Sequence, residues 1–169
     1  MPDHLPDFLD PVSFADKNRR IVGELDFARF DKLADLVVGE SGGAQFELRF
    51  GKVGRVPSAT GVLDATLILQ CQRCLGELPW HVHADMNLGF VGSVDEVALL
   101  PESMEPVMID AEGHVSLVDI VQDELLLAIP SVPRHEDCGL SKVAGKPESD
   151  RPNPFAVLNQ FKNTTSFKE

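Results

Sequence analysis

Four residues of this 169-residue chain have side chains that could together hold a metal ion. Cys71 and Cys74 form a C-x-x-C pair, and His135 and Cys138 form an H-x-x-C pair much further along the chain. Three thiolates and one imidazole are a ligand set that binds Zn²⁺ in tetrahedral geometry. The C-x-x-C pair could instead form a disulfide, act as a redox pair or remain two reduced, partly buried cysteines. The spacing leaves these alternatives open, because it does not place the four side chains around one point.

The C-x-x-C pair is predicted to lie at the connection between two antiparallel strands. Residues 78–90 alternate strictly between apolar and polar side chains, which is typical of a half-buried strand. Residues 62–70, just before the cysteines, are also predicted to form a strand. A thioredoxin-like redox motif opens a helix after a strand. The strand-turn-strand setting therefore disfavours that role.

Hydrophobic spacing, caps and breakers predict the other elements. Asp10 and Ser116 are suitable N-caps for helices, and Pro57 and Gly61 are expected to bound a turn. The expected helices cover residues 10–17, 27–37 and 117–129. The expected further strands cover residues 20–25, 44–50 and 106–110, and residues 92–96 are expected to form a loop. These elements predict an α+β fold with a mainly antiparallel sheet, a long central hairpin, a few peripheral helices and an irregular C-terminal segment.

The length suits one domain with a sizeable core. Residues 1–130 are expected to form the α+β core domain. Residues 131–169 are expected to form an extended linker and a short C-terminal helix within the same domain. Asn153 would cap that helix, and Phe155 would begin its apolar stripe.

The net charge of −12 is concentrated in the middle of the chain. Residues 61–130 contain 12 acidic residues and a single basic one, Arg73. This region would repel a phosphate backbone and attract a cationic partner. Arg73 is therefore conspicuous, since it lies between the two cysteines of the C-x-x-C pair.

The sequence contains no recognised catalytic motif, such as a P-loop, a G-x-G-x-x-G loop or an H-E-x-x-H helix. His81, His83 and Asp85 share the polar face of one expected strand, and solvent exposure explains them better than catalysis. We therefore expect a protein that is not an enzyme. The odd number of cysteines and the lack of a signal peptide or a membrane-spanning run predict a cytoplasmic protein without a membrane partner.

Three blocks of the sequence together resemble the YceD family, the bacterial large ribosomal RNA subunit accumulation proteins. They are residues 69–74, residues 98–106 leading into 118–130, and residues 152–158. The resemblance implies a role in making or keeping large-subunit ribosomal RNA, and no enzymatic activity. Some relatives carry a cysteine-rich C-terminal segment that looks like a zinc ribbon. This chain retains only His135 and Cys138 of it.

The leading hypothesis is a non-enzymatic ribosome-biogenesis factor that promotes synthesis, processing or accumulation of large-subunit (23S) ribosomal RNA. Its partner would be that RNA, a pre-ribosomal particle or, as the acidic middle favours, a basic ribosomal protein. No small-molecule substrate is expected. The candidate contact residues are Gln72, Arg73, Arg49, Lys52, Arg55, Lys142, Lys146, Arg151 and Phe155. The alternative hypothesis is a zinc-binding or redox-responsive protein centred on Cys71, Cys74, His135 and Cys138, with zinc as its one cofactor.

Overall fold

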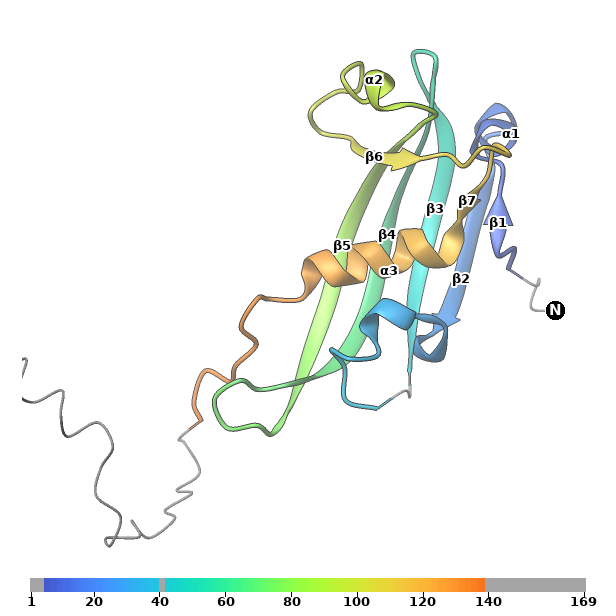
Figure 1. Cartoon of the computed structure of the whole chain (residues 1–169). Coiled ribbons are helices and arrows are strands. Elements are labelled where there is room, and N and C mark those ends of the chain that lie inside the picture. Colours follow the sequence, from blue (N-terminus) through green and yellow to red (C-terminus); the bar gives the residue numbers. More distant parts are fainter. Residues whose placement is uncertain (1–4, 40–41, 139–169) are drawn as a thin grey trace, which may run out of the picture. The chain divides into compact units, whose positions relative to one another are not determined.

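The computed structural model describes residues 5–39 and 42–138, and within these residues the fold is built on one curved sheet (Figure 1). Its five strands lie side by side in the order β2 (Arg20–Asp26), β3 (Gly43–Val53), β4 (Val56–Gln70), β5 (Glu77–Val91) and β6 (Glu105–Met108). Neighbouring strands are antiparallel except for β5 and β6, which are parallel. The other elements are β1 (Phe8–Leu9), β7 (Val115–Ser116), α1 (Pro11–Asp16), α2 (Val94–Val97) and α3 (Leu117–Ala128). The α+β prediction is confirmed.

The long central hairpin is formed by β4 and β5, which pair from Ser58↔Gly89 to Gln70↔Glu77. The alternation in the sequence matches the burial along β5, where Val82 and Met86 are buried and His81 and His83 are exposed. The C-x-x-C pair lies in the turn of this hairpin, as predicted. The apolar–polar alternation of the sequence therefore predicted the position of the cysteines correctly, because it shows directly which face of a strand is covered.

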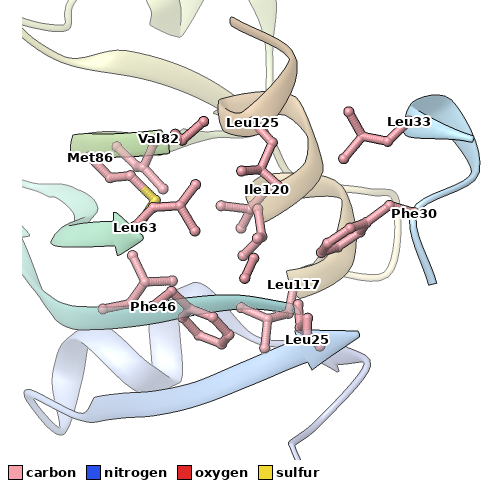
Figure 2. Packing of buried hydrophobic residues seen from close by; sticks show 14 of the residues in the cluster. Leu25, Phe30, Leu33, Phe46, Leu63, Val82, Met86, Leu117, Ile120 and Leu125 are labelled. Atoms are coloured by element: carbon pink, nitrogen blue, oxygen red, sulfur yellow. The ribbon is translucent and has the colours of Figure 1, made fainter. Parts of the chain in front are cut away.

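Helix α3 crosses one face of the sheet and supplies much of its cover (Figures 1 and 2). The hydroxyl oxygen of Ser116 accepts a hydrogen bond from the Asp119 N–H, which caps the helix as predicted. Leu117 and Leu125 on α3 are fully buried, and Figure 2 shows them among side chains from β2 to β5. Burial of one leucine contributes roughly 1.5–3 kcal/mol. The α3–sheet contact is thus a main source of stability.

The prediction of one helix over 27–37 is wrong. Phe27–Arg29 and Asp31–Leu33 instead form two single-turn 3₁₀-helices. Phe27, Phe30 and Leu33 are buried, and their spacing of three matches the three residues per turn of a 3₁₀-helix. All three belong to the hydrophobic core, and Figure 2 shows Phe30 and Leu33 beside α3.

The predicted turn at Pro57 and Gly61 is also wrong, because both residues lie inside β4. Pro57 pairs with Lys52 on β3 but precedes the first residue of β4 that pairs with β5, so its missing N–H costs no ladder bond. A Cβ at Gly61 would clash with the carbonyl oxygen of Glu47 on β3. Here glycine permits close backbone approach rather than marking a turn. The loop predicted at 92–96 overlaps the single-turn helix α2, which covers Val94–Val97.

The described residues belong to one compact unit of the chain, which ends at Cys138. The predicted C-terminal helix and the candidate contact residues Lys142, Lys146, Arg151 and Phe155 lie outside the described residues. Among the residues that are described, no helix has the length and apolar character needed to cross a membrane.

Candidate functional site

Cys71, Cys74, His135 and Cys138 come together at the turn of the β4–β5 hairpin. One potential ligand atom from each of the four lies within 4.8 Å of the others. The Sγ atoms of Cys71 and Cys138 are 3.5 Å apart, and the Sγ atom of Cys74 is 3.4 Å from Nδ1 of His135. All three cysteines are free thiols. The structure therefore brings together the four residues that the sequence singled out.

The hairpin turn positions the first two members of this Cys₃His cluster. The Cys71 N–H donates to the Gly76 carbonyl, and the Leu75 N–H donates to the Cys71 carbonyl, each over 2.9 Å. Leu75 has a φ of 60°, a left-handed conformation that an L side chain rarely adopts. This compact turn directs Cys71 into the interior, where it is fully buried.

The other two members arrive on the segment that follows α3. Figure 1 shows this segment, in orange, descending beside the β4–β5 turn. The Gln72 N–H donates to the Pro133 carbonyl over 2.8 Å. The guanidinium of Arg73 donates to the carbonyls of His135 and Glu136, over 2.9 and 3.2 Å. Arg73 thus binds the backbone of the second half of the cluster.

Arg73 also contacts the cluster directly, since its Nε–H donates to the Sγ atom of Cys138 over 3.1 Å. The sequence predicted Arg73 as a partner contact, and no signal in the sequence revealed this inward role. The contact with a partner stays a prediction.

Interactions within the cluster shift the pKa values of Cys71, Cys74 and His135. Burial acts to raise the pKa of Cys71, but hydrogen bonds from the backbone of Cys74, Arg73 and His135 outweigh burial and lower that pKa to about 5. The Gly76 N–H acts to lower the pKa of Cys74, whereas the interaction with Cys71 prevails and raises it. Hydrogen bonds with Cys138 and Cys71 raise the pKa of His135. The cluster therefore favours a thiolate at Cys71.

The tautomer of His135 is defined by a backbone contact. Its Nε2 atom lies 3.0 Å from the carbonyl oxygen of Glu77. A carbonyl only accepts, so Nε2 carries the hydrogen and donates it. In the neutral ring Nδ1 then has a free lone pair, and Nδ1 is the atom that faces Cys74.

The other predicted contact residues lie away from this cluster. Arg49, Lys52 and Arg55 lie at or near the β3–β4 turn, at the opposite end of β4 from the cysteines. The Nε–H of Arg49 donates to Glu47 over 2.6 Å, and Lys52 forms an ion pair with Asp16. Arg73 is therefore not part of a common basic surface with these three residues.

His81 and His83 lie on the uncovered face of the sheet rather than in a catalytic arrangement. His81 contacts the Thr66 hydroxyl over 3.0 Å, and Nδ1 of His83 lies 2.6 Å from Asp64. The hydrogen bond to Asp64 raises the pKa of His83. Both side chains are exposed, in agreement with the interpretation from the sequence.

Sequence reasoning missed an acidic groove between α3 and β6. Its volume is about 790 Å³, and it combines charged and apolar side chains. The acidic lining residues are Glu105, Asp119, Asp123 and Glu124. The spacing of Asp119 and Asp123, four apart on one helix, could have indicated a common acidic face.

Lys32 and Glu124 define the electrostatics of this acidic groove. The Lys32 ammonium lies 2.7 Å from Asp123 and 3.7 Å from Asp119. Glu124 is only 8% exposed, and burial together with a hydrogen bond to Glu105 raises its pKa to about 7. The lining of the groove therefore includes one cation, Lys32, and one buried carboxyl group, that of Glu124, whose pKa is raised.

The fold and the cluster define an α+β protein whose C-x-x-C hairpin turn meets a distant H-x-x-C segment. A family model described as "Large ribosomal RNA subunit accumulation protein YceD" matches residues 59–162. A Haemophilus influenzae protein of that same name is 33% identical over 167 residues, which cover 94% of this chain and 96% of that protein. The chain belongs to the YceD family. No solved structure matched it.

Proposed function

We propose that this chain promotes the accumulation of large-subunit ribosomal RNA without acting as an enzyme, by binding a basic ribosomal protein in the acidic groove between α3 and β6. Membership of the YceD family supports the first part, since the matching relative is named for that role. The groove supports the second part. The observation that carries the choice of partner is the set of four carboxyl groups around an apolar floor.

The shape and chemistry of the groove suit a basic amphipathic segment. Leu127 and Met108 line it and are 75% and 49% exposed, so they offer apolar contacts to a partner. Asp119 and Asp123 stand beside them and would pair with lysine or arginine side chains. Apolar contacts would supply most of the affinity, and the carboxylates would supply the encounter rate and the specificity.

Lys32 illustrates that a lysine fits between these carboxylates. Its hydrogen bond to Asp123 raises the pKa of Lys32, so its ammonium stays charged. A partner's lysine or arginine could take over the same carboxylates. Since the ion pair is largely exposed, exchanging one cation for another costs little.

A protein partner fits the described residues better than broad contact with RNA. The described candidate cations do not form one basic surface, because Arg73 is engaged at the Cys₃His cluster and the other three lie at the opposite end of β4. Broad contact with RNA needs several lysine or arginine side chains that together face the phosphates. The acidic groove would repel phosphates.

A pull-down from cells tests this function. Tagged wild-type chain is expected to retain a basic ribosomal protein after nuclease treatment. An Asp119→Asn/Asp123→Asn variant is expected to lose that protein and to fail in restoring large-subunit ribosomal RNA in a strain without the wild-type gene. The matched control is Asp95→Asn/Glu102→Gln, which removes the same charge outside the groove. Loss of every ribosomal protein after nuclease treatment, or undiminished binding by the groove variant, would contradict the proposal.

A further inference from the structure

We propose that Cys71, Cys74, His135 and Cys138 bind one Zn²⁺ ion, which fastens the segment after α3 to the turn of the β4–β5 hairpin. This site is separate from the acidic groove, so it stands or falls independently of the proposed function. Neither the family description nor the name of the relative mentions a metal.

The geometry of the Cys₃His cluster is close to that of a tetrahedral zinc site. Bonds of about 2.3 Å to sulfur and 2.0 Å to nitrogen place neighbouring ligand atoms roughly 3.5–3.8 Å apart. The observed separations are 3.5 Å for Cys71 with Cys138 and 3.4 Å for Cys74 with His135. No separation among the four ligand atoms exceeds 4.8 Å. Small side-chain rotations would therefore bring all four to bonding distance.

His135 is oriented as a ligand before any ion binds. The hydrogen bond from Nε2 to the Glu77 carbonyl directs the free lone pair of Nδ1 toward Cys74. Histidines that bind metals usually donate their other ring N–H to a carbonyl or carboxylate, which fixes the tautomer and the ring plane. Metal binding therefore explains why the Nδ1 lone pair of His135 is directed at the three thiols.

The charge around the cluster also suits zinc. Three thiolates, a neutral imidazole and Zn²⁺ sum to a net charge of −1. Arg73 supplies the compensating positive charge, since its Nε–H donates to Cys138. It is the one basic residue in the region 61–130. Its position between the two hairpin cysteines therefore has a physical reason. Thiolates with an imidazole in tetrahedral geometry select zinc over hard cations such as Mg²⁺.

A disulfide is the competing outcome. Oxidation of Cys71 and Cys138 would form one S–S bond and pass two electrons and two protons to an oxidant. It would give Cys74 and His135 no role, although both belong to the same cluster. The zinc site uses all four residues and needs no oxidant.

The ion would close a long loop in this compact unit of the chain. Cys138 is the last residue of that unit, so zinc would hold its end on the hairpin. The hydrogen bonds from Gln72 and Arg73 already follow the same path. Because the four ligands come together only in the folded chain, the binding free energy of zinc would add to the stability of the fold.

Metal analysis of the full chain, purified without chelator, tests the site. Wild type is expected to contain about one zinc per chain. The variants His135→Ala and Cys138→Ser are each expected to bind zinc much more weakly than wild type. The loss should exceed the roughly 10–100-fold that follows mutation of residues that only hydrogen-bond to metal ligands. The matched control His81→Ala, an exposed histidine outside the cluster, is expected to keep the zinc. Circular dichroism checks that each variant retains the sheet.

Two further measurements keep the test decisive if a variant fails to fold. Wild type loaded with Co²⁺ is expected to show the visible bands of a tetrahedral thiolate complex. Its three thiols are expected to react with a thiol reagent only after a chelator is added. Less than about 0.2 zinc per chain with freely reactive thiols would overturn the proposal. So would a Cys71–Cys138 disulfide in wild type purified under reducing conditions, or zinc retained by both ligand variants.

Discussion

The Nδ1 atom of His135 lies 3.4 Å from the Sγ atom of Cys74, although 61 residues separate them in the chain. This contact joins the segment after α3 to the turn of the central hairpin. It is reinforced by hydrogen bonds from Arg73 to the carbonyls of His135 and Glu136.

Replacing Arg73 by lysine is expected to loosen the segment 131–138. Lysine keeps the positive charge but cannot donate to two carbonyls and a sulfur at once. We expect the unfolding free energy to fall by only about 1 kcal/mol, because the lost hydrogen bonds come from an exposed side chain. Hydrogen exchange is expected to quicken in residues 131–138 and to stay unchanged in β3. Arg55→Lys, at the opposite end of β4, is the control; equal effects from the two substitutions would contradict the role given to Arg73.

Chelation is expected to lower the melting temperature of the wild-type chain by several degrees, because an ion that binds the folded state alone stabilises it by mass action. Cys138→Ser is expected to melt earlier than wild type and to be insensitive to chelator. Scanning calorimetry with and without chelator provides the measurement. A wild-type melting temperature that chelator leaves unchanged would count against a zinc-stabilised junction.

Replacing Glu124 by glutamine is expected to stabilise the protein at pH 8 but not at pH 4.5. The pKa of Glu124 is raised from 4.5 to about 7 by burial and by Glu105. Between pH 4.5 and about pH 7 the carboxyl group of Glu124 is protonated in the folded state but ionised in the unfolded chain. Its contribution to the unfolding free energy therefore falls as the pH rises through this range. Glutamine removes that dependence and gains about 1–3 kcal/mol at pH 8. Urea unfolding at both pH values measures the difference; an equal gain at pH 4.5 would refute the explanation, and Glu102→Gln is the control.

Two leucines on α3 are expected to differ sharply in their effects on stability. Leu117 is 0% exposed, so Leu117→Ala leaves a cavity and costs about 2–5 kcal/mol. Leu127 is 75% exposed, so Leu127→Ala changes stability by no more than about 0.5 kcal/mol. Denaturant unfolding of both variants checks the stability.

Leu127→Ala is also expected to weaken binding of the basic partner, and unaltered binding would argue against the groove as its site.

Removing the cation that the groove itself supplies is expected to strengthen binding of the basic partner. Lys32→Gln frees Asp119 and Asp123 for the partner's cations. We expect a several-fold faster association at low salt, which disappears as salt screens the field. Stopped-flow association with the partner captured in the pull-down measures this rate, and Lys17→Gln, at the residue that follows α1, is the control. Slower association of the Lys32 variant would contradict an electrostatic role for the groove.

The sequence predicted the central hairpin and α3 well, because both depend on local signals. Strict alternation in β5 reports one covered face, and Ser116 caps α3 through the N–H of Asp119, only three residues away. Prediction from the sequence failed where the role of a residue depends on a neighbouring strand. Gly61 permits close approach to Glu47, and Pro57 lies where β4 has a single partner. Neither condition is visible in the residues themselves.

The candidate zinc ligands show the same division. The sequence by itself determined their identities and the turn that holds Cys71 and Cys74, since residue type and short-range geometry are local properties. Only the tertiary structure decided that His135 and Cys138 join them, because α3 must first cross the sheet and return the chain to the hairpin. The acidic groove arose in the same way, from carboxylates of β6 and α3 that meet only when the helix packs. Local propensities act over a few residues, whereas burial of the apolar face of α3 fixes which distant segments become neighbours.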